Sequence, residues 1–157
     1  MALYIARSPN NRLEKPGALL LLHPTLDWVC FYSDSIKRNA CSDYVSPIFS
    51  SGYSASCLCG RLSKDWLGDS VYASPASAVA THFKGLPPAF IVAGEAEQMV
   101  DSIRAFAVKL EEAGVQIRHA EYEDAYHCCV AFRGLHTARM LGDMAEWLEG
   151  GGGLAKA

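Results

Sequence analysis

The chain has 157 residues, of which 50% are hydrophobic and 20% are charged, and its formal net charge at pH 7 is −3. This length fits one domain of ordinary size, and the composition is that of a folded globular protein, which excludes a disordered chain. The mild charge, with no basic stripe, gives no sign of a nucleic-acid partner, and no apolar run is long enough for a membrane span.

The first clear element is the apolar run 18–23 (ALLLLH), which predicts a β-strand that ends at a proline. Before it, residues 1–7 have helical character but no N-cap residue, so the sequence begins as if inside a helix. Asp27, Trp28 and Phe31 follow the strand directly. They are candidate substrate-binding residues if the carboxyl end of the strand is the working edge, and the alternative is that the aromatic rings pack beneath a long loop.

The segment 25–82 has weak hydrophobic periodicity and is expected to be rich in loops. Residues 50–56 (SSGYSAS) are small and polar, which predicts a loop. Residues 61–67 have the pattern of one or two helical turns. No predicted element of this segment is long enough to organise the fold.

The stretch 86–129 carries the clearest pattern in the chain. Its apolar run 89–93 (AFIVA) predicts a strand that is covered on both faces in a parallel sheet. Apolar residues then recur at three- and four-residue spacing over 99–110, and Gly114 stands where a C-cap glycine belongs, which predicts an amphipathic helix of about four turns. Residues 115–122 predict the next strand.

Acidic residues follow the first of these strands, and a histidine follows the second. Glu95, Glu97 and Asp101 lie just beyond the first strand, and a short loop leads from the second strand to His127. A strand–helix–strand unit of this length is a right-handed parallel crossover, so both loops leave the same edge of the sheet. Ligands and catalytic groups collect at that edge. The sequence therefore predicts a site that combines a carboxylate with His127.

The last predicted element is a helix over residues 135–149. Its apolar positions form one stripe, which is expected to pack against the sheet: Ala138, Leu141, Met144, Ala145 and Leu148. A run of glycines ends this helix. We therefore expect a domain over residues 1–149 and a flexible, glycine-rich tail over residues 150–157.

The six cysteines are expected to be reduced thiols of a cytoplasmic protein, because no secretory signal precedes them. Their spacing does not match a zinc site, so we expect no metal and no cofactor. The sequence offers no partner for the histidines other than His127. We interpret the remaining four as ordinary structural residues: His23, His82, His119 and His136.

Five separate blocks of the chain, in this order, carry a resemblance to a known family: PGALLLLHPTLDW (16–28), RNACSDYVSP (38–47), DSVYASPASA (69–78), GLPPAFIVAGEAEQMVDSIRAF (85–106) and YEDAYHCCVAF (122–132). They resemble the C-terminal half of the α/β-hydrolase fold, specifically the hormone-sensitive-lipase-like esterases (α/β hydrolase fold-3). The resemblance implies a partial α/β-hydrolase fold with about three parallel strands and flanking helices, without the N-terminal strands of the family.

The resemblance also implies catalytic roles. In the family, the loop after the strand that matches 89–93 holds the catalytic acid, and the turn after the next strand holds the catalytic histidine, which His127 matches. Glu97 falls where the family usually has aspartate. Asp101 matches a second acidic position and is the rival acid, although it could simply favour the start of the following helix. Glu95 is a further rival, because spacing alone does not rank three carboxylates of one loop. The implied substrate is a carboxylic ester with a small or medium acyl chain.

Neither the G-x-S-x-G nucleophile elbow nor the HGGG-type oxyanion motif of the family is present in the sequence. Residues 1–7 resemble the middle of the helix after that elbow, so the chain is expected to start just after the serine. One hypothesis is an ester-hydrolase half that is inactive alone and needs an N-terminal half. The other is a non-catalytic remnant that acts as a binding or interaction module.

Loss of the N-terminal strands has a structural consequence for the strand that contains Ala18 and Leu22. In the family this strand should have the nucleophile-bearing strand as its neighbour. Without that neighbour it becomes an exposed apolar edge, which is a template for pairing with another chain. We therefore expect self-association through this edge.

Overall fold

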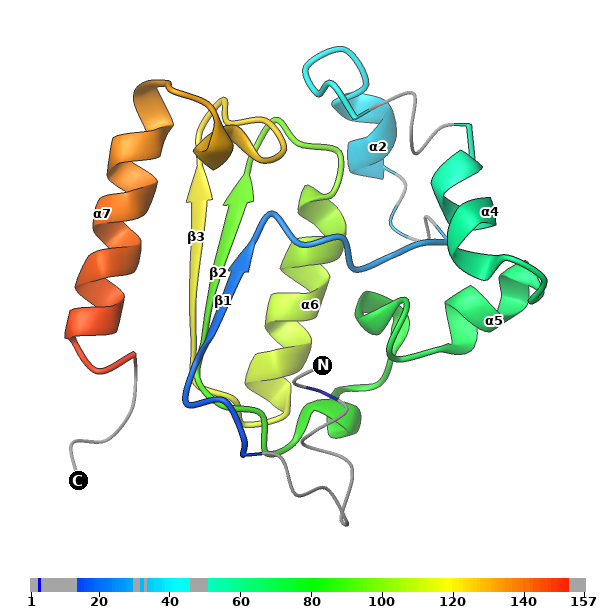
Figure 1. The fold of residues 1–157 in the computed structure, drawn as a ribbon, viewed down its shortest axis with the longest axis horizontal. Coiled ribbons are helices and arrows are strands. Elements are labelled where there is room, and N and C mark those ends of the chain that lie inside the picture. The colour runs from blue at the N-terminus through cyan, green and yellow to red at the C-terminus, as the bar shows by residue number, and fades with distance from the viewer. Residues whose placement is uncertain (1–2, 4–13, 30–31, 33, 46–50, 153–157) are drawn as a thin grey trace.

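The computed structural model describes residue 3 and residues 14–29, 32, 34–45 and 51–152. Its centre is a parallel sheet with the strand order β1-β2-β3 (Figure 1). The strands are β1 (Leu19–Leu22), β2 (Ala89–Gly94) and β3 (Ile117–Tyr122). The predicted partial fold of three parallel strands with flanking helices is therefore confirmed.

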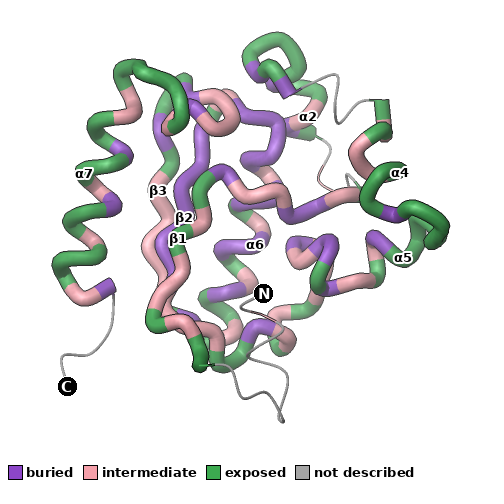
Figure 2. The backbone as a smooth tube through the Cα atoms, in the orientation of Figure 1, coloured by how far each residue is buried: buried purple, intermediate pink, exposed green. Residues whose placement is uncertain are grey.

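The middle strand, β2, is buried along its whole length, as Figure 2 shows. Its side chains alternate between two hydrophobic clusters. Ala89, Ile91 and Ala93 join the cluster on one face of the sheet, and Phe90 and Val92 join the cluster on the other. Both faces are covered, which explains why the strand has an unbroken apolar sequence rather than an alternating one.

Two long helices cover the sheet from opposite sides (Figure 1). They are α6 (Val100–Glu112) and α7 (Leu135–Glu149). On α6 the residues at three- and four-residue spacing, Ile103, Phe106 and Leu110, are buried in the first cluster. The predicted amphipathic helix is confirmed, and it forms the crossover between β2 and β3.

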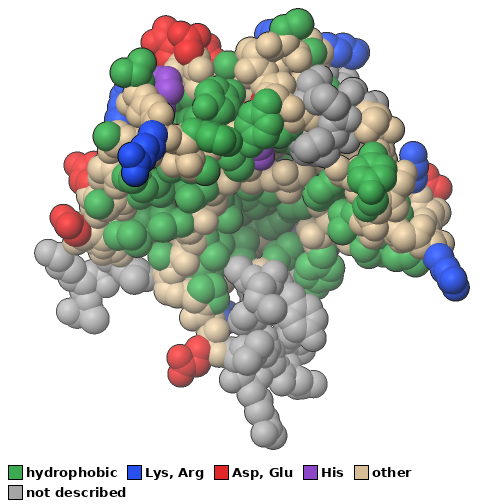
Figure 3. Space-filling view, turned by 45° about the horizontal axis from the view of Figure 1, so that its top comes forward, with side chains coloured by type: hydrophobic (Ala, Val, Ile, Leu, Met, Phe, Trp, Pro, Cys, Tyr) green, Lys and Arg blue, Asp and Glu red, His purple; other side chains and the backbone are tan. Residues whose placement is uncertain are grey.

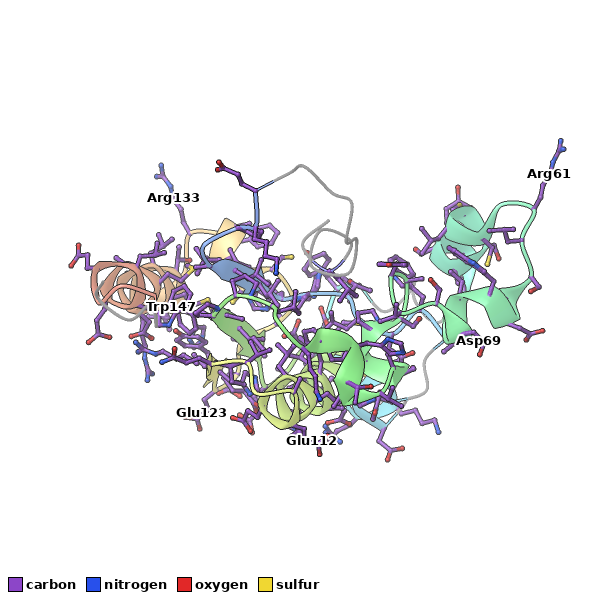
Figure 4. All side chains as sticks on the ribbon, turned by 90° about the horizontal axis from the view of Figure 1, so that it is seen from below. Arg61, Asp69, Glu112, Glu123, Arg133 and Trp147 are labelled. Atoms are coloured by element: carbon purple, nitrogen blue, oxygen red, sulfur yellow. The ribbon has the colours of Figure 1, made fainter. Side chains whose placement is uncertain are left out.

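The face of α7 that packs on the sheet shares only Met144 with the predicted stripe. Met140, Met144 and Trp147 join the second cluster, and Figure 4 shows Trp147 on the sheet side of the helix. Leu141 and Leu148, which were expected to be buried, are 53% and 51% exposed. Two adjacent faces of α7 carry apolar residues, and helical spacing alone does not select between them. The larger ring and sulfur side chains fill the space over the sheet.

The segment between β1 and β2 forms a lobe beside the sheet, and Arg61 and Asp69 lie at its outer end in Figure 4. Its helices and short 3-10 turns are α2 (Asp34–Arg38), α4 (Tyr53–Cys59), α5 (Lys64–Asp69), η1 (Pro75–Ser77) and η2 (Ala80–Phe83). A further 3-10 turn, η3 (Cys129–Ala131), precedes α7. The helical turns expected near 61–67 correspond to α5.

The loop predicted over 50–56 is wrong for its described part, because α4 begins at Tyr53. Small polar residues favour loops locally, but tertiary contacts override that weak preference. Cys59 at the end of α4 packs with Leu67 and Ala73 in a small hydrophobic cluster. The helix is therefore formed by burial of one end rather than by the local sequence.

The two edges of the sheet differ in character. β3 carries Arg118 and Glu121, and charged side chains on an edge strand oppose pairing with other chains. β1 consists only of leucines, and Leu20 and Leu22 are each 39% exposed. Within the described residues, no strand pairs with the outer side of β1. The apolar edge expected from the sequence is thus present in the described fold.

The ends of the chain are described only in part. Residues 150–152 form a turn after α7, whereas the rest of the predicted tail, 153–157, and most of the predicted helix at 1–7 lie outside the described residues. The domain limit at residue 149 therefore stays a prediction. In the described ranges, none of the helices has the combination of length and apolar character that crossing a bilayer requires.

Candidate active site

Three side chains from the ends of the three strands meet at one edge of the sheet. His23 directly follows β1, Glu97 lies in the turn after β2, and His127 lies in the turn after β3. The strands are parallel and therefore end at the same edge, which is the upper edge in Figure 1. The structure thus brings the predicted carboxylate and His127 together, and it adds a histidine from β1.

Glu97 is the centre of this cluster, and its side chain is 0% exposed. One carboxylate oxygen, Oε2, lies 2.9 Å from Nδ1 of His127. The other, Oε1, lies 3.2 Å from Nδ1 of His23 and accepts the backbone N–H of Gly94 at 2.7 Å. Both oxygens therefore have partners, as a buried carboxylate requires.

The hydrogen bonds also determine the ionisation of Glu97. Burial by itself would raise the pKa of the carboxyl group, because the charged form loses its hydration. The hydrogen bonds from His127 and His23, together with the Gly94 amide, outweigh burial and place the pKa of Glu97 below its ordinary value. Glu97 is therefore a carboxylate at neutral pH, which is the state that can orient an imidazole and stabilise its protonated form.

The segment 34–45 holds the Glu97 turn in place through polar side chains. Asn39 Nδ2 donates to the carbonyl of Glu97 at 2.8 Å. Ser35 Oγ donates to the carbonyl of Gln98 at 2.7 Å, and Asp43 Oδ2 accepts the N–H of Gln98 at 2.8 Å. These bonds satisfy backbone groups that β-sheet pairing does not reach, so the acid is held by a segment distant in sequence.

The turn that carries His127 packs directly on the end of β2. The carbonyl of Ala125 accepts the N–H of Ala96 at 3.0 Å, and a Cβ on Gly94 would lie only 2.1 Å from that carbonyl oxygen. Gly94 thus permits the close approach of the two turns. The His127 side chain is 12% exposed. Since Nδ1 faces Glu97, the Nε2 edge of the ring is available to an incoming group.

Asp101, the rival acid, lies at the start of α6, directly after the turn that carries Glu97. Its Oδ1 forms ion pairs with Arg38 Nη2 and Arg104 Nη1, each at 3.2 Å. It is the acidic residue in the first turn of α6, the position in which a carboxylate favours a helix N-terminus. The carboxylate that contacts His127 is that of Glu97.

His23 is the site residue that the sequence interpretation missed. It was interpreted as an ordinary histidine, but it is 2% exposed and its Nδ1 contacts Glu97. A signal was available in the sequence, because His23 ends a predicted parallel strand and therefore lies at the same edge as Glu97 and His127. The ring centroids of His23 and His127 are 5.9 Å apart, with an interplanar angle of 67°.

The three candidate substrate-binding residues after β1 have different surroundings. Asp27 is 3% exposed, and its Oδ2 accepts the N–H of Tyr32 at 2.9 Å, which stabilises the loop. Trp28 lines a cavity of about 480 Å³ together with residues of α4 and α5, including Lys64. Phe31 lies outside the described residues. A role for these residues in substrate binding stays a prediction.

A cluster of three aromatic rings lies beside His127 and contacts it through Tyr44. The ring of Tyr44 lies with its centroid 6.5 Å from that of His127, and 6.0 Å and 5.9 Å from those of Tyr126 and Phe132. In Figure 3, hydrophobic side chains gather across the middle of the face shown, around a hollow, and charged side chains lie toward the periphery. The aromatic cluster beside His127 is suited to contact an apolar substrate group.

Thiols and metal-binding groups make no further site. The described cysteines are free: Cys41, Cys57, Cys59, Cys128 and Cys129. Burial raises the pKa of Cys128, and it raises that of Cys129 to about 11, so both favour the protonated thiol. In the part of the chain that the structure describes, no group of three or more His, Cys, Asp or Glu side chains is placed to hold a metal ion.

A parallel sheet with helices on both faces and a histidine–carboxylate pair at its carboxyl edge has the architecture of the α/β hydrolases. A family profile described as alpha/beta hydrolase fold matches residues 1–131. The chain therefore belongs to this family, the fold-3 group of esterases and lipases. No curated protein matches the sequence.

Similar solved structures include several esterases. An esterase/lipase from an uncultured bacterium superposes with a TM-score of 0.77 at 21% identity, over 98% of this chain and 49% of that one. EstE5, soaked with p-nitrophenyl butyrate, gives 0.75 at 23% identity, over 90% and 46%. A thermostable esterase from Pseudomonas putida gives 0.65 at 27% identity, over 82% and 38%. The chain therefore spans about half or less of the length of these esterases.

Proposed function

We propose that Glu97 and His127 are the acid and the base of a Ser-His-acid triad that hydrolyses carboxylic esters. The observation that carries this proposal is the 2.9 Å contact between His127 Nδ1 and Oε2 of the fully buried Glu97. Membership of the family and the likeness to solved esterases support the ester as substrate class. The family resemblance supports a small or medium acyl chain, and the aromatic cluster that contacts His127 through Tyr44 supports an apolar one.

The geometry supplies the proton-transfer half of the reaction. In such a triad the serine Oγ attacks the acyl carbon while the histidine Nε2 takes its proton, and the same nitrogen then protonates the leaving alcohol. His127 would perform both transfers at Nε2, because its Nδ1 is held by Glu97. The buried carboxylate fixes the tautomer and stabilises the imidazolium that forms. Glutamate can serve as the acid in this class of enzyme.

The nucleophile must come from elsewhere. The 157 residues contain no G-x-S-x-G motif, and among the described residues the hydrogen bond of the His127 ring is to Glu97. We propose that a segment outside these residues supplies the serine and the oxyanion-hole donors, in line with the coverage of the solved esterases. One oxyanion donor alone contributes about 3–4 kcal/mol to the transition state. The chain by itself is therefore expected to be inactive.

The edge of β1 is the proposed place for that segment. Leu20 and Leu22 leave an apolar edge whose backbone groups have no strand partner in the described fold. A further parallel strand would satisfy those groups and cover both leucines. When no such strand is present, we expect two copies of the chain to associate through the same edge.

The free thiols support a reducing compartment. Every described cysteine is unpaired with another cysteine, including the neighbouring Cys128 and Cys129. Disulfides are rare in the cytosol, where thiols are kept reduced. We propose on this basis that the protein acts in the cytoplasm, and its localisation in fractionated cells would test that.

The test has two stages, both with p-nitrophenyl butyrate as the substrate. The chain alone is compared with His127→Ala, and no difference in the hydrolysis rate is expected. The chain is then produced together with an N-terminal half of an esterase of this family that carries G-x-S-x-G, and co-elution of the halves is checked. The complex is expected to hydrolyse the ester at a rate that His127→Ala and Glu97→Gln abolish.

Asp101→Asn is the matched control, because Asp101 lies four residues after Glu97, at the start of α6, but contacts arginines instead of His127. It is expected to leave most of the activity in place. A co-eluting complex that is no faster than its His127→Ala form would contradict the proposal and favour a non-catalytic binding module. If the chain alone hydrolyses the ester and His127→Ala removes this activity, the 157 residues themselves contain a nucleophile.

A further inference from the structure

His23 is not a member of the proposed triad, yet it is buried beside Glu97 and has an uncommon backbone conformation. It follows β1 directly, precedes Pro24, and has a positive φ of 46°, a conformation that non-glycine residues adopt uncommonly. Such backbone strain persists only where the surrounding structure holds it, and it clusters at functional sites. The strained backbone turns the ring inward, where its side chain is 0% exposed.

Among the described residues, His23 makes its side-chain contacts with the active-site cluster. Its Nδ1 lies 3.2 Å from Glu97 Oε1, and its Nε2 lies 3.8 Å from the Sγ of Cys129. Its ring packs at an angle against that of His127. These groups, from the turns after β2 and β3 and from η3, are the titratable groups that face it. His23 therefore links the acid, the base and a buried thiol.

The carboxylate of Glu97 determines which nitrogen of His23 carries the proton, because an ionised carboxylate only accepts hydrogen bonds and Nδ1, which faces it, must donate. Burial, with the nearby charge of Glu97 as the next cause, raises the pKa of Cys129 to about 11, so the thiol keeps its hydrogen and can donate it. Two acceptors lie within reach of that hydrogen, Sδ of Met140 at 3.7 Å and Nε2 of His23 at 3.8 Å. A neutral imidazole has one donor and one acceptor nitrogen, so with Nδ1 donating to Glu97, Nε2 is the acceptor.

The carboxylate of Glu97 needs this second donor to keep one orientation. Its Oε1 accepts from both Gly94 N–H and His23 Nδ1–H, and this pair of bonds leaves Oε2 directed at His127. With the Gly94 bond alone, the carboxylate could rotate about its terminal torsion, which is a broad and soft one. A rotated carboxylate would no longer select one tautomer of His127.

We propose that His23 is a positioning residue, which holds Glu97 Oε1 so that Oε2 fixes His127 in the Nδ1–H tautomer. This inference rests on the proposed roles of Glu97 and His127 in ester hydrolysis. No proton leaves His23 during the reaction, because its Nδ1–H remains on the carboxylate while His127 Nε2 exchanges a proton with the substrate. His23 therefore acts through Glu97 and does not touch the ester.

The test is the tautomeric state of each histidine in the whole chain, measured by long-range ¹H–¹⁵N correlation spectra above the pH at which the rings are protonated. The wild-type protein is expected to show both His23 and His127 as Nδ1–H tautomers. His23→Ala is expected to lower the preference of His127 for Nδ1–H by roughly tenfold or more, the effect of losing a charge-assisted hydrogen bond. His82→Ala, at a half-buried histidine of η2, is the control and should change nothing at His127.

His23→Asn separates positioning from a loss of packing. The asparagine amide offers an N–H donor in place of Nδ1–H, and asparagine tolerates a positive φ better than other residues. It is expected to restore most of the His127 preference that His23→Ala loses. Equal behaviour of the two variants, or an unchanged His127 in His23→Ala, would overturn the proposal. If His23→Ala does not fold, an Nε2–H tautomer of His23 in the wild type is by itself sufficient to overturn it.

These spectra need neither substrate nor nucleophile, so the two proposals fail separately. A silent enzyme complex with the predicted tautomers would contradict the triad and leave the positioning role intact. An active complex in which His127 keeps its tautomer without His23 would contradict only the positioning role. In the active complex, His23→Ala is expected to lower kcat with little change in KM, and His23→Asn to recover most of the loss.

Discussion

Gly94→Ala tests whether the close approach between β2 and the His127 turn is required for the fold. A Cβ at this position would lie 2.1 Å from the carbonyl oxygen of Ala125 and 2.6 Å from its carbonyl carbon. Both are backbone atoms, so no side-chain rotation can relieve the overlap. The end of β2 and the turn must therefore move apart, which would also displace His127 from Glu97.

The magnitude follows from the contacts that such a movement disturbs. Forcing an extra carbon into a packed interior costs about 1–3 kcal/mol. Separation also breaks the 3.0 Å bond from Ala96 N–H to the Ala125 carbonyl, and a buried hydrogen bond contributes about 1 kcal/mol. We therefore expect Gly94→Ala to lower the free energy of unfolding by about 2–4 kcal/mol.

Urea unfolding followed by far-ultraviolet circular dichroism measures this change, and Gly142→Ala is the matched control. Gly142 lies within α7, and a Cβ there meets nothing within 4 Å. Alanine is a better helix former than glycine, so the control is expected to raise the free energy of unfolding by about 0.5–1 kcal/mol. The same chemical change should thus have opposite signs at the two positions.

The reasoning would be refuted by a Gly94→Ala protein whose free energy of unfolding lies within about 0.5 kcal/mol of the wild type, the range of an ordinary surface substitution. Such a result would mean that the turns can separate at little cost and that the approach at Gly94 does not determine the position of His127. A large loss in both variants would instead indicate that any added methyl group is harmful.

Three further predictions concern the site and the edge of the sheet. Asn39→Ala removes hydrogen bonds to the carbonyls of Glu95 and Glu97 (3.0 and 2.8 Å) and is expected to cost about 2–3 kcal/mol in urea unfolding, whereas a loss below about 0.5 kcal/mol would contradict it. The pKa of Glu97 is lower in the folded protein than its ordinary value, so its carboxylate stabilises the fold at pH values above that ordinary value, and this contribution is lost as the pH falls through the folded-state pKa. Glu97→Gln should therefore make the urea midpoint less sensitive to acid. An unchanged pH profile of the midpoint would refute this. Replacing Leu20 and Leu22 by lysine is expected to abolish self-association in static light scattering, and a wild-type chain that is already monomeric would count against the proposed edge pairing.

The regular elements with strong patterns could be predicted from the sequence. The apolar run 89–93 required a strand with both faces covered, and that strand is β2. The three- and four-residue spacing before Gly114 predicted α6, and the helix expected over 135–149 is α7 with those bounds. These elements could be predicted because their periodicity is a property of consecutive residues.

Elements that depend on distant contacts were not predicted. α4 was missed because its small polar residues have no helical pattern and its end is held by Leu67 and Ala73. The buried face of α7 was misplaced because two apolar faces, one with Leu141 and one with Met140, compete for the sheet. In both cases the local sequence allowed more than one structure, and packing selected one.

The same division applies to the candidate site. The sequence determined that an acidic loop and His127 leave the same edge of the sheet, because two strands joined by a helical crossover are parallel and end at the same edge. Only the tertiary structure showed that Glu97 rather than Asp101 contacts His127, and that His23 shares the carboxylate. Neighbouring residues in the sequence determine the direction of a strand, whereas the orientation of one carboxylate depends on donors at the ends of three different strands.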